Sequence, residues 1–153
     1  MDTVDRSILD ALRANARATY AELAREVGLS APAVHERVGK LEAQGVITGY
    51  HAAVAPESLG YSMSALVGVF LSDTADEDAV AAGLAGLAAV EDCWFVAGEE
   101  SFVVKVRVPD VAGLEQAIRA VTKISGVART RSTVVLSTRF EGRVQSAGIP
   151  AKG

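Results

Sequence analysis

The polar residues in the segment 30–42 have the types and spacing of a surface that binds double-stranded DNA. Val34, Val38 and Leu41 recur at helical spacing, so they form one apolar face and turn the residues between them outward. An outward Arg or Lys can donate to a guanine edge or a phosphate, His35 can bond a base edge, and small side chains allow close approach. The side chains that we expect to contact DNA are Tyr20, Ser30, Ala31, Ala33, His35, Glu36, Arg37, Lys40 and His51.

Glu36 and His51 are each expected to make a different kind of contact with DNA. A carboxylate only accepts hydrogen bonds, so Glu36 suits a cytosine amino group or the rejection of wrong sites. His51 follows the helix in sequence and is expected beside a phosphate. The same pattern is also typical of a helical hairpin whose polar face meets only water, and periodicity alone leaves both interpretations open.

The residues before this segment supply the geometry that DNA contact needs. Residues 22–27 end a helix, Gly28 suits the left-handed turn, and Ser30 can cap the next helix by accepting from the Ala33 amide. Pro32 falls in the first turn, where its missing N–H has no helical partner. Two helices joined by so short a turn predict a helix-turn-helix at about 20–39, with the second helix in a major groove.

A second group of polar residues lies in the other half of the chain. Residues 98–101 form a turn with backbone amides, two carboxylates and a hydroxyl. Residues 130–133 add guanidinium and hydroxyl groups. These groups match the carboxylate and ammonium of an amino acid. The expected effector-binding residues are Gly98, Glu99, Glu100, Ser101, Thr130, Arg131, Ser132 and Thr133. Gly-Glu-Glu-Ser is also a good hairpin turn, and alternating Arg and Thr is typical of an exposed strand.

Other reactive chemistry is sparse in this sequence. Cys93 is the only cysteine, which excludes an intramolecular disulfide and a cysteine zinc site. His35 and His51 have no cysteine or paired carboxylate at metal-ligand spacing. There is no glycine-rich phosphate loop and no nucleophile elbow. We therefore expect no metal, no cofactor and no enzymatic activity.

Two regions of different periodicity must position these residues. From residue 4 to about residue 44 the apolar spacing is helical and predicts three helices. Residues 46–54 are short and β-like, and residues 55–60 interrupt the pattern with proline and glycine. We therefore expect a helix-turn-helix domain at 1–54 and a linker at 55–60.

Beyond residue 60, strand and helix patterns alternate. The expected order is strand 62–71, helix 76–88, strand 91–96, strand 102–108, a helix capped by Asp110 and, after Gly126, strand 127–136. This βαββαβ order predicts a ferredoxin-like domain at 61–140 and gives the chain the α+β class. Residues 141–153, rich in Gly, Ser and Pro, are expected to form a flexible tail.

The strand 62–71 is apolar on both faces, since Leu66 and Phe70 alternate with Ala65, Val67 and Val69. A solvated second face is normally polar, so we expect a partner subunit to bury part of it. The alternative is a strand whose ends are tucked under loops. The sequence thus favours a homo-oligomer.

Composition and charge limit the kinds of partner. The 153 residues carry a net charge of −4, and residues 1–60 hold six Lys or Arg against eight Asp or Glu. One helical domain is therefore expected to bind DNA weakly, whereas several domains held together gain avidity. The apolar runs are far too short to cross a bilayer, and the acidic start is unlike a secretory signal, so we expect no membrane contact and a cytoplasmic protein.

Several motifs, taken in order, resemble the Lrp/AsnC family of bacterial transcription regulators over roughly residues 2–140. They are Asp5-Arg-Ser-Ile-Leu9, Arg17-Ala-Thr-Tyr-Ala-Glu-Leu-Ala24, Val27-Gly-Leu-Ser30, Arg37-Val38, Lys40-Leu-Glu42, Gly45-Val-Ile47, Gly49-Tyr50, Ala97-Gly-Glu-Glu-Ser-Phe102 and Gly126 to Leu136. No single motif is specific, but the ordered set is.

The resemblance implies a winged helix-turn-helix joined to a domain that regulates amino acid metabolism. Such a domain forms dimers that assemble further, commonly to octamers or hexadecamers, and holds an amino acid between subunits near the glycine turn and the last strand. Many members have an aspartate and then an aromatic after that turn, whereas this chain has Ser101-Phe102, so ammonium recognition passes to Glu99 or Glu100 or the ligand differs. The alternative function is an amino-acid sensor whose helical half docks a protein.

Overall fold

The structure, a computed structural model, describes residues 1–143 and divides into two compact units. One unit comprises Met1–Ala53 with the described residues from Phe140, and the other is Val54–Arg139. Of the tail expected at 141–153, residues 144–153 lie outside the described residues. Within residues 1–143, no helix is long and apolar enough to cross a membrane.

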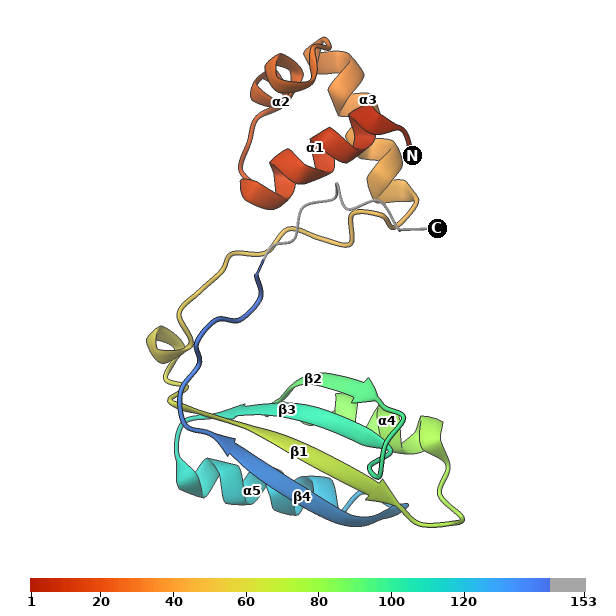
Figure 1. Ribbon diagram of the computed structural model, residues 1–153, viewed down its shortest axis with the longest axis vertical. Helices are drawn as coiled ribbons and strands as arrows, with labels where there is room; N and C mark the ends of the chain where they lie inside the picture. Colours follow the sequence, from red (N-terminus) through yellow and green to blue (C-terminus); the bar gives the residue numbers. More distant parts are fainter. Residues whose placement is uncertain (144–153) are drawn as a thin grey trace. The chain divides into compact units, whose positions relative to one another are not determined.

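The first unit contains three α-helices, α1 (Thr3–Ala14), α2 (Tyr20–Val27) and α3 (Ala31–Ala43) (Figure 1). Each begins after a residue whose side chain accepts a hydrogen bond from a first-turn amide, namely Asp2, Thr19 and Ser30. Such caps satisfy amides that have no partner inside the helix. The prediction of three helices is confirmed.

The apolar faces of these helices meet in one small core. Ile8, Leu23, Val34 and Val38 are almost completely buried in it. Burying a side chain of this size stabilises a fold by about 1.5–3 kcal/mol. The core therefore fixes which side of α3 turns inward and which side is left for a partner.

The turn between α2 and α3 has the predicted geometry. Gly28 has a φ of 71°, in the left-handed region that favours glycine. The Ser30 Oγ accepts from the Ala33 amide at 3.4 Å, and Pro32 lies in the first turn of α3. The helix-turn-helix is thus present at the predicted place.

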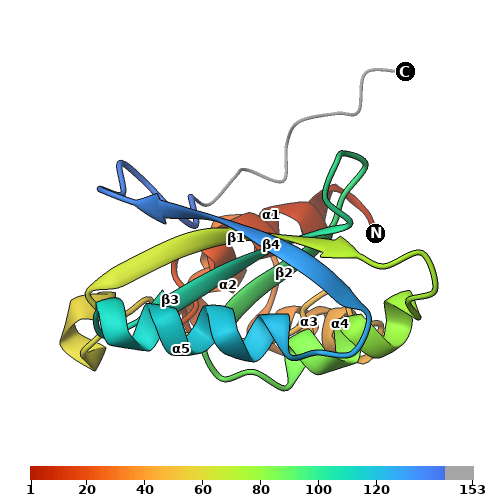
Figure 2. The same cartoon turned by 90° about the horizontal axis from the view of Figure 1, so that it is seen from below.

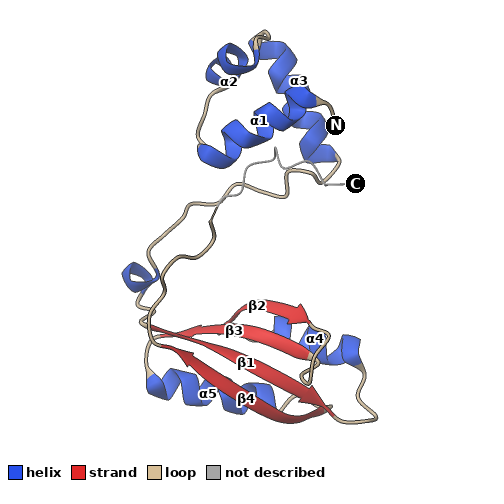
Figure 3. Cartoon of the chain, in the orientation of Figure 1, coloured by secondary structure: helices blue, strands red, loops and turns tan. Residues whose placement is uncertain are grey.

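The expected β-like segment at residues 46–54 does not form a strand (Figure 3). The amides of Val46 and Ile47 instead donate to the Leu41 carbonyl, at 2.9 and 3.2 Å, so the chain turns back at the end of α3. A strand needs a neighbouring strand to satisfy its backbone, and the described residues of the first unit contain none. The prediction of a β-structured wing was therefore wrong.

The second unit has the predicted βαββαβ order, preceded by a short 3-10 helix in the expected linker. Its elements are η1 (Pro56–Leu59), β1 (Met63–Leu71), α4 (Glu77–Ala85), β2 (Val90–Phe95), β3 (Phe102–Val108), α5 (Val111–Thr122) and β4 (Val127–Val135). The strands form one antiparallel sheet in the order β2-β3-β1-β4. Both helices cover the same face of this sheet (Figures 1 and 2).

The covered face carries the core of the second unit. Ala65, Val67 and Val69 of β1 are fully buried there, among side chains from α4, α5 and β3. The opposite face, which we call the open face, carries no helix, and Leu66 and Trp94 on it are 40% and 48% exposed. An apolar surface of this kind suits burial by a partner.

Replacing Gly126 by alanine is expected to destabilise the second unit by about 1–3 kcal/mol. Gly126 has a φ of 95°, and an added Cβ would lie 3.0 Å from the Ala75 Cβ and 3.1 Å from the Val80 side chain. Denaturant unfolding measures the loss. Gly86→Ala is the control, because Gly86 has a φ of −75° and its nearest neighbouring atom is 3.5 Å away. Equal losses in both variants would contradict the argument.

Candidate functional sites

The outward face of α3 carries most of the side chains predicted to contact DNA. His35, Glu36 and Lys40 are exposed, and Ala31 and Ala33 are half-buried at the start of the helix. The Lys40 Nζ lies 2.7 Å from the Glu36 Oε1, and this hydrogen bond lowers the pKa of Glu36. Since both side chains are solvated, the pair can open towards a base edge or a phosphate.

The remaining predicted DNA contacts have local structural partners. The Ser30 hydroxyl is used by the cap of α3. The rings of Tyr20 and His35 meet edge to face with their centroids 4.8 Å apart. The His51 ring lies beside Gly49, where an added Cβ would come within 2.8 Å of the Nε2 atom. His51 is exposed in the irregular segment that follows α3.

Arg37 is ion-paired with the start of α1. Its Nη1 lies 2.7 Å from the Asp2 Oδ2 and 2.7 Å from the Asp5 Oδ1, and the Arg37 and Asp5 side chains are 33% and 15% exposed. The hydrogen bonds to Asp5 and then to Asp2 raise the pKa of Arg37. Sequence spacing placed Arg37 on the flank of α3 but carried no signal for a partner 32 or 35 residues earlier. The Nη1 of the guanidinium is thus engaged within the protein.

Tyr50 ties the segment after α3 to the last turn of that helix. Its hydroxyl donates to the Glu42 Oε1 at 2.8 Å. Burial, followed by this hydrogen bond, raises the pKa of Tyr50 to about 12. The contact holds the segment that contains His51 against α3, in place of the β ladder that was expected.

The two stretches predicted to bind an amino acid meet on the open face. The Arg131 guanidinium is ion-paired with Glu100, and its Nη1 lies 3.7 Å from the Glu99 Oε2. Arg131 is the register partner of Gly68 on β1, and a Cβ on Gly68 would come within 2.6 Å of the Glu100 Cγ. Gly68 thus leaves the space in which Glu100 crosses the sheet to reach β4.

Alternation along β4 divides the four candidates on that strand. Arg131 and Thr133 share the open face with Leu66, the register partner of Thr133. Thr130 and Ser132 pair with valines of the buried core and so point to the covered face. A ligand on the open face therefore meets the first two side chains and not the other two.

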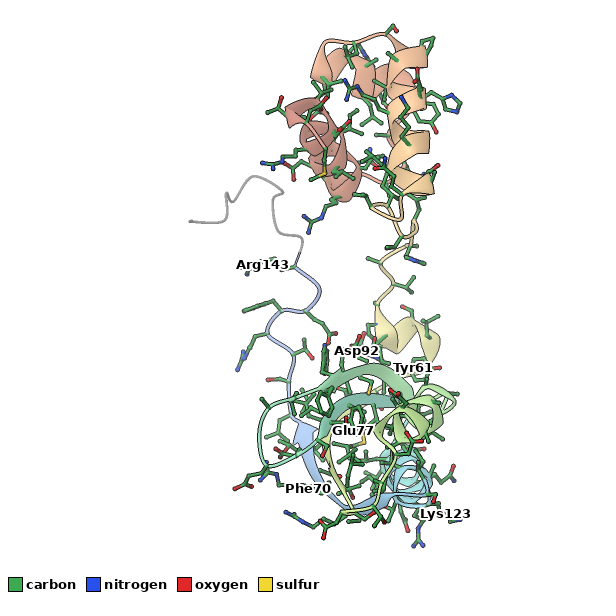
Figure 4. The ribbon with its side chains drawn as sticks, turned by 90° about the vertical axis from the view of Figure 1, so that its right-hand side faces the viewer. Tyr61, Phe70, Glu77, Asp92, Lys123 and Arg143 are labelled. Carbon is green, nitrogen blue, oxygen red and sulfur yellow. The ribbon has the colours of Figure 1, made fainter. Side chains whose placement is uncertain are left out.

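The ends of the glycine turn and of β4 are fixed by further contacts. The Ser101 amide donates to the Val69 carbonyl at 2.9 Å, which holds the residues after Gly98 to β1. The guanidinium carbon of Arg129 lies 3.4 Å from the ring centroid of Phe70, which Figure 4 labels. A cation over an aromatic face is attracted by its quadrupole, so Arg129 is also held in place.

A cluster of charges at the other side of the open face was not predicted. The Glu91 Oε2 lies 2.7 Å from the Lys105 Nζ and 3.0 Å from the Arg107 Nε. Burial acts to raise the pKa of Glu91, but the hydrogen bonds from the two cations outweigh it and lower the pKa. Alternation on β3 placed both cations on one face, but the sequence carried no signal for Glu91, which lies where the pairing of β2 with β3 is irregular, between Val90 and Asp92.

A groove of about 350 Å³ lies between α5 and residues 87–90, among side chains that include Val108 and Ala117. The residues predicted to bind an amino acid do not line it. In the described part of the chain, no three His, Cys, Asp or Glu side chains are grouped as a metal site.

Comparison with known protein families gives two matches that together span most of the chain. Residues 1–42 match the AsnC-type helix-turn-helix domain, and residues 64–145 match the Lrp/AsnC ligand binding domain. The HTH-type transcriptional regulator LrpA of Mycobacterium tuberculosis is 41% identical over 143 residues, which cover 94% of this chain and 95% of the relative. The regulatory protein AsnC of Escherichia coli is 35% identical over 136 residues, which cover 89% and 88%.

Solved structures agree with these matches. A feast or famine regulatory protein from M. tuberculosis complexed with L-methionine has a TM-score of 0.89 and 41% identity, over 95% of this chain and 98% of that chain. A transcriptional regulator from Neisseria meningitidis, also in complex with L-Met, has a TM-score of 0.85 and 26% identity, over 92% and 93%.

The pKa of Tyr50 predicts how the first unit responds to alkali. Because the fold favours the protonated hydroxyl, the unfolded chain releases this proton near pH 10 and the folded chain only near pH 12. Stability from this group is therefore present below pH 10 and is lost as the pH rises towards 12. Absorbance titration of phenolate, with Tyr50→Phe subtracted, measures the pKa. Glu42→Gln should lower it, and an unchanged value would contradict the role of the hydrogen bond.

Proposed function

The chain belongs to the Lrp/AsnC family of transcriptional regulators, and on that premise we propose that it binds operator DNA through α3 and an amino acid on the open face. The observation that carries the proposal is a helix-turn-helix with an exposed α3 face, in one chain with an Lrp/AsnC ligand binding domain. The family consists of regulators and not of enzymes. Because its target is genomic DNA, we place its action in the cytoplasm.

Contact with DNA is proposed for the outward face of α3 and the residues beside it. Lys40 supplies a cation to guanine or phosphate, and Glu36 accepts from cytosine or rejects other bases. His35 lies on the same exposed face, with Tyr20 against its ring, and His51 extends the contact to a phosphate. The small side chains at the start of α3, Ala31 and Ala33, let the helix approach the groove closely.

A second copy of the chain is proposed to cover the open face. Leu66 and Trp94 are exposed there. A two-fold axis relates the two copies, so that each copy covers the same side chains of the other. Dimers assembling further, to an octamer, would carry several helix-turn-helix units.

The amino acid is proposed to bind between subunits at the glycine turn and β4. Arg131 is suited to its carboxylate, Glu99 and Glu100 to its ammonium, and Ser101 and Thr133 to further hydrogen bonds. A similar M. tuberculosis regulator is complexed with L-methionine, which supports an amino acid as the ligand class. A ligand changes DNA binding only if its affinity differs between two arrangements of the subunits, which then differ in the spacing of their α3 helices.

Binding to DNA upstream of its own gene tests the proposal through a mobility shift at a series of salt concentrations. We expect affinity to fall steeply with salt, and Lys40→Ala to lower the slope of log K against log salt by about one. Lys123→Ala, at the end of α5, is the matched control and should leave the slope unchanged. If an amino acid binds and no DNA does, the helical unit docks a protein instead.

The effector site is tested with a pair of β4 variants on opposite faces of the sheet. Thr133→Val, on the open face, should blunt the effect of added amino acids on DNA binding and leave binding without them unchanged. Thr130→Val, on the covered face, is the control and should respond normally. Titration calorimetry with a panel of free amino acids gives the affinities. Equal responses of the two variants would place the ligand elsewhere.

A further inference from the structure

The ion pair of Arg37 joins parts of the first unit that lie 32 and 35 residues apart in sequence. One guanidinium nitrogen lies 2.7 Å from an oxygen of Asp2 and 2.7 Å from an oxygen of Asp5. The two carboxylates also accept each other's amides, at 2.8 and 2.9 Å, in the capping box of α1. Because the acceptors are fixed by the helix they cap, Arg37 meets a preformed site.

Arg37 stands where it can set the rotation of α3 about its axis. Successive residues on a helix are about 100° apart, so fixing one side chain orients its neighbours. Val38 faces the core on one side of Arg37, and Glu36 faces solvent on the other. The contact of one guanidinium nitrogen with two carboxylates at 2.7 Å adds a defined direction to the orientation that the apolar core gives α3.

We propose that Asp2 and Asp5 are positioning residues for DNA binding, which act through Arg37 to orient α3 and keep the Arg37 charge away from phosphate. This inference rests on the proposed function of α3. The sequence alone suggested that Arg37 contacts a base or a phosphate. The inference instead assigns Arg37 to the support of the protein surface that contacts DNA. The two carboxylates act only through Arg37 and touch no base.

The ion pair has a consequence for specificity. An arginine without an ion-pair partner can contact a phosphate in DNA of any sequence. This contact strengthens binding to all DNA and makes the binding depend more steeply on salt. A paired arginine gives up that contact and leaves α3 correctly oriented for base edges. Removing a carboxylate should therefore weaken binding to the operator relative to random DNA, because one charge is released and the helix is less well oriented.

The test uses the full chain with Asp5→Asn, Arg37→Gln, the double variant and Arg37→Lys. The matched controls are Glu26→Gln and Arg25→Gln, which remove single charges from the exposed surface of α2. Each protein is titrated with DNA upstream of its own gene and with a random fragment of equal length, over a salt series. Amide hydrogen exchange in α1 and α3 is measured on the same proteins without DNA.

We expect Asp5→Asn to lower the ratio of specific to random affinity by about three- to tenfold and to steepen the salt slope by about one. Arg37→Gln should lower the ratio as much, with no loss of salt slope, and Arg37→Lys should recover part of it. Exchange in α1 and α3 should be no faster in the double variant than in the single ones.

Two results would overturn the inference. The first is a salt slope that falls by about one in Arg37→Gln while Asp5→Asn keeps the wild-type ratio, because Arg37 would then contact DNA directly. The second is additive exchange in the double variant, because the residues would then not be coupled. If the wild-type chain prefers neither DNA, the proposed function fails, and the exchange data still decide whether Asp5 and Arg37 hold α1 to α3.

Discussion

The burial of one face of the four-stranded sheet decides where the candidate ligand groups on β4 lie. Side chains alternate along a strand, so packing Val67 against α4 and α5 commits its neighbours to the open face. The register of β1 with β4 carries this alternation to Arg131 and Thr133. A slip of one residue would turn them inward and present Thr130 and Ser132 instead. The position of the polar groups is thus fixed by hydrophobic burial.

Much of this arrangement can be predicted from sequence because it depends on local chemistry. Gly28, Ser30 and Asp110 mark element boundaries through backbone conformation and capping, and each has its predicted role. Apolar periods of 3.6 and 2 identify the elements that face a core, which is why the βαββαβ order was predictable. The glycine turn and β4 were also predicted as the two halves of one site, although their chemistry alone did not show that Glu100 and Arg131 are in contact.

What the sequence did not show depends on partners that are distant in the chain. Residues 46–54 have a strand-like pattern, but a strand forms only beside another, and the segment is held by Tyr50 and Glu42 instead. Arg37 stands at a position suited to DNA contact, but it is ion-paired with Asp2 and Asp5 at the start of α1. Periodicity describes the face on which a side chain lies and does not identify what it meets there.

On the proposal that α3 binds DNA, the charges of α3 make a single helix-turn-helix a weak basis for affinity. Both of its cations are ion-paired, Arg37 with α1 and Lys40 with Glu36, so the helix presents shape and hydrogen-bonding groups more than net positive charge. Binding through phosphate attraction alone would favour all DNA equally, whereas a helix with balanced charge gains affinity mainly where its base contacts fit. The affinity that one unit lacks can then come from several units bound at once, whose joint binding depends on the spacing of sites. A regulator built in this way gains specificity from the fit of α3 and affinity from assembly. An effector that alters the assembly can therefore change the affinity for DNA without changing the specificity.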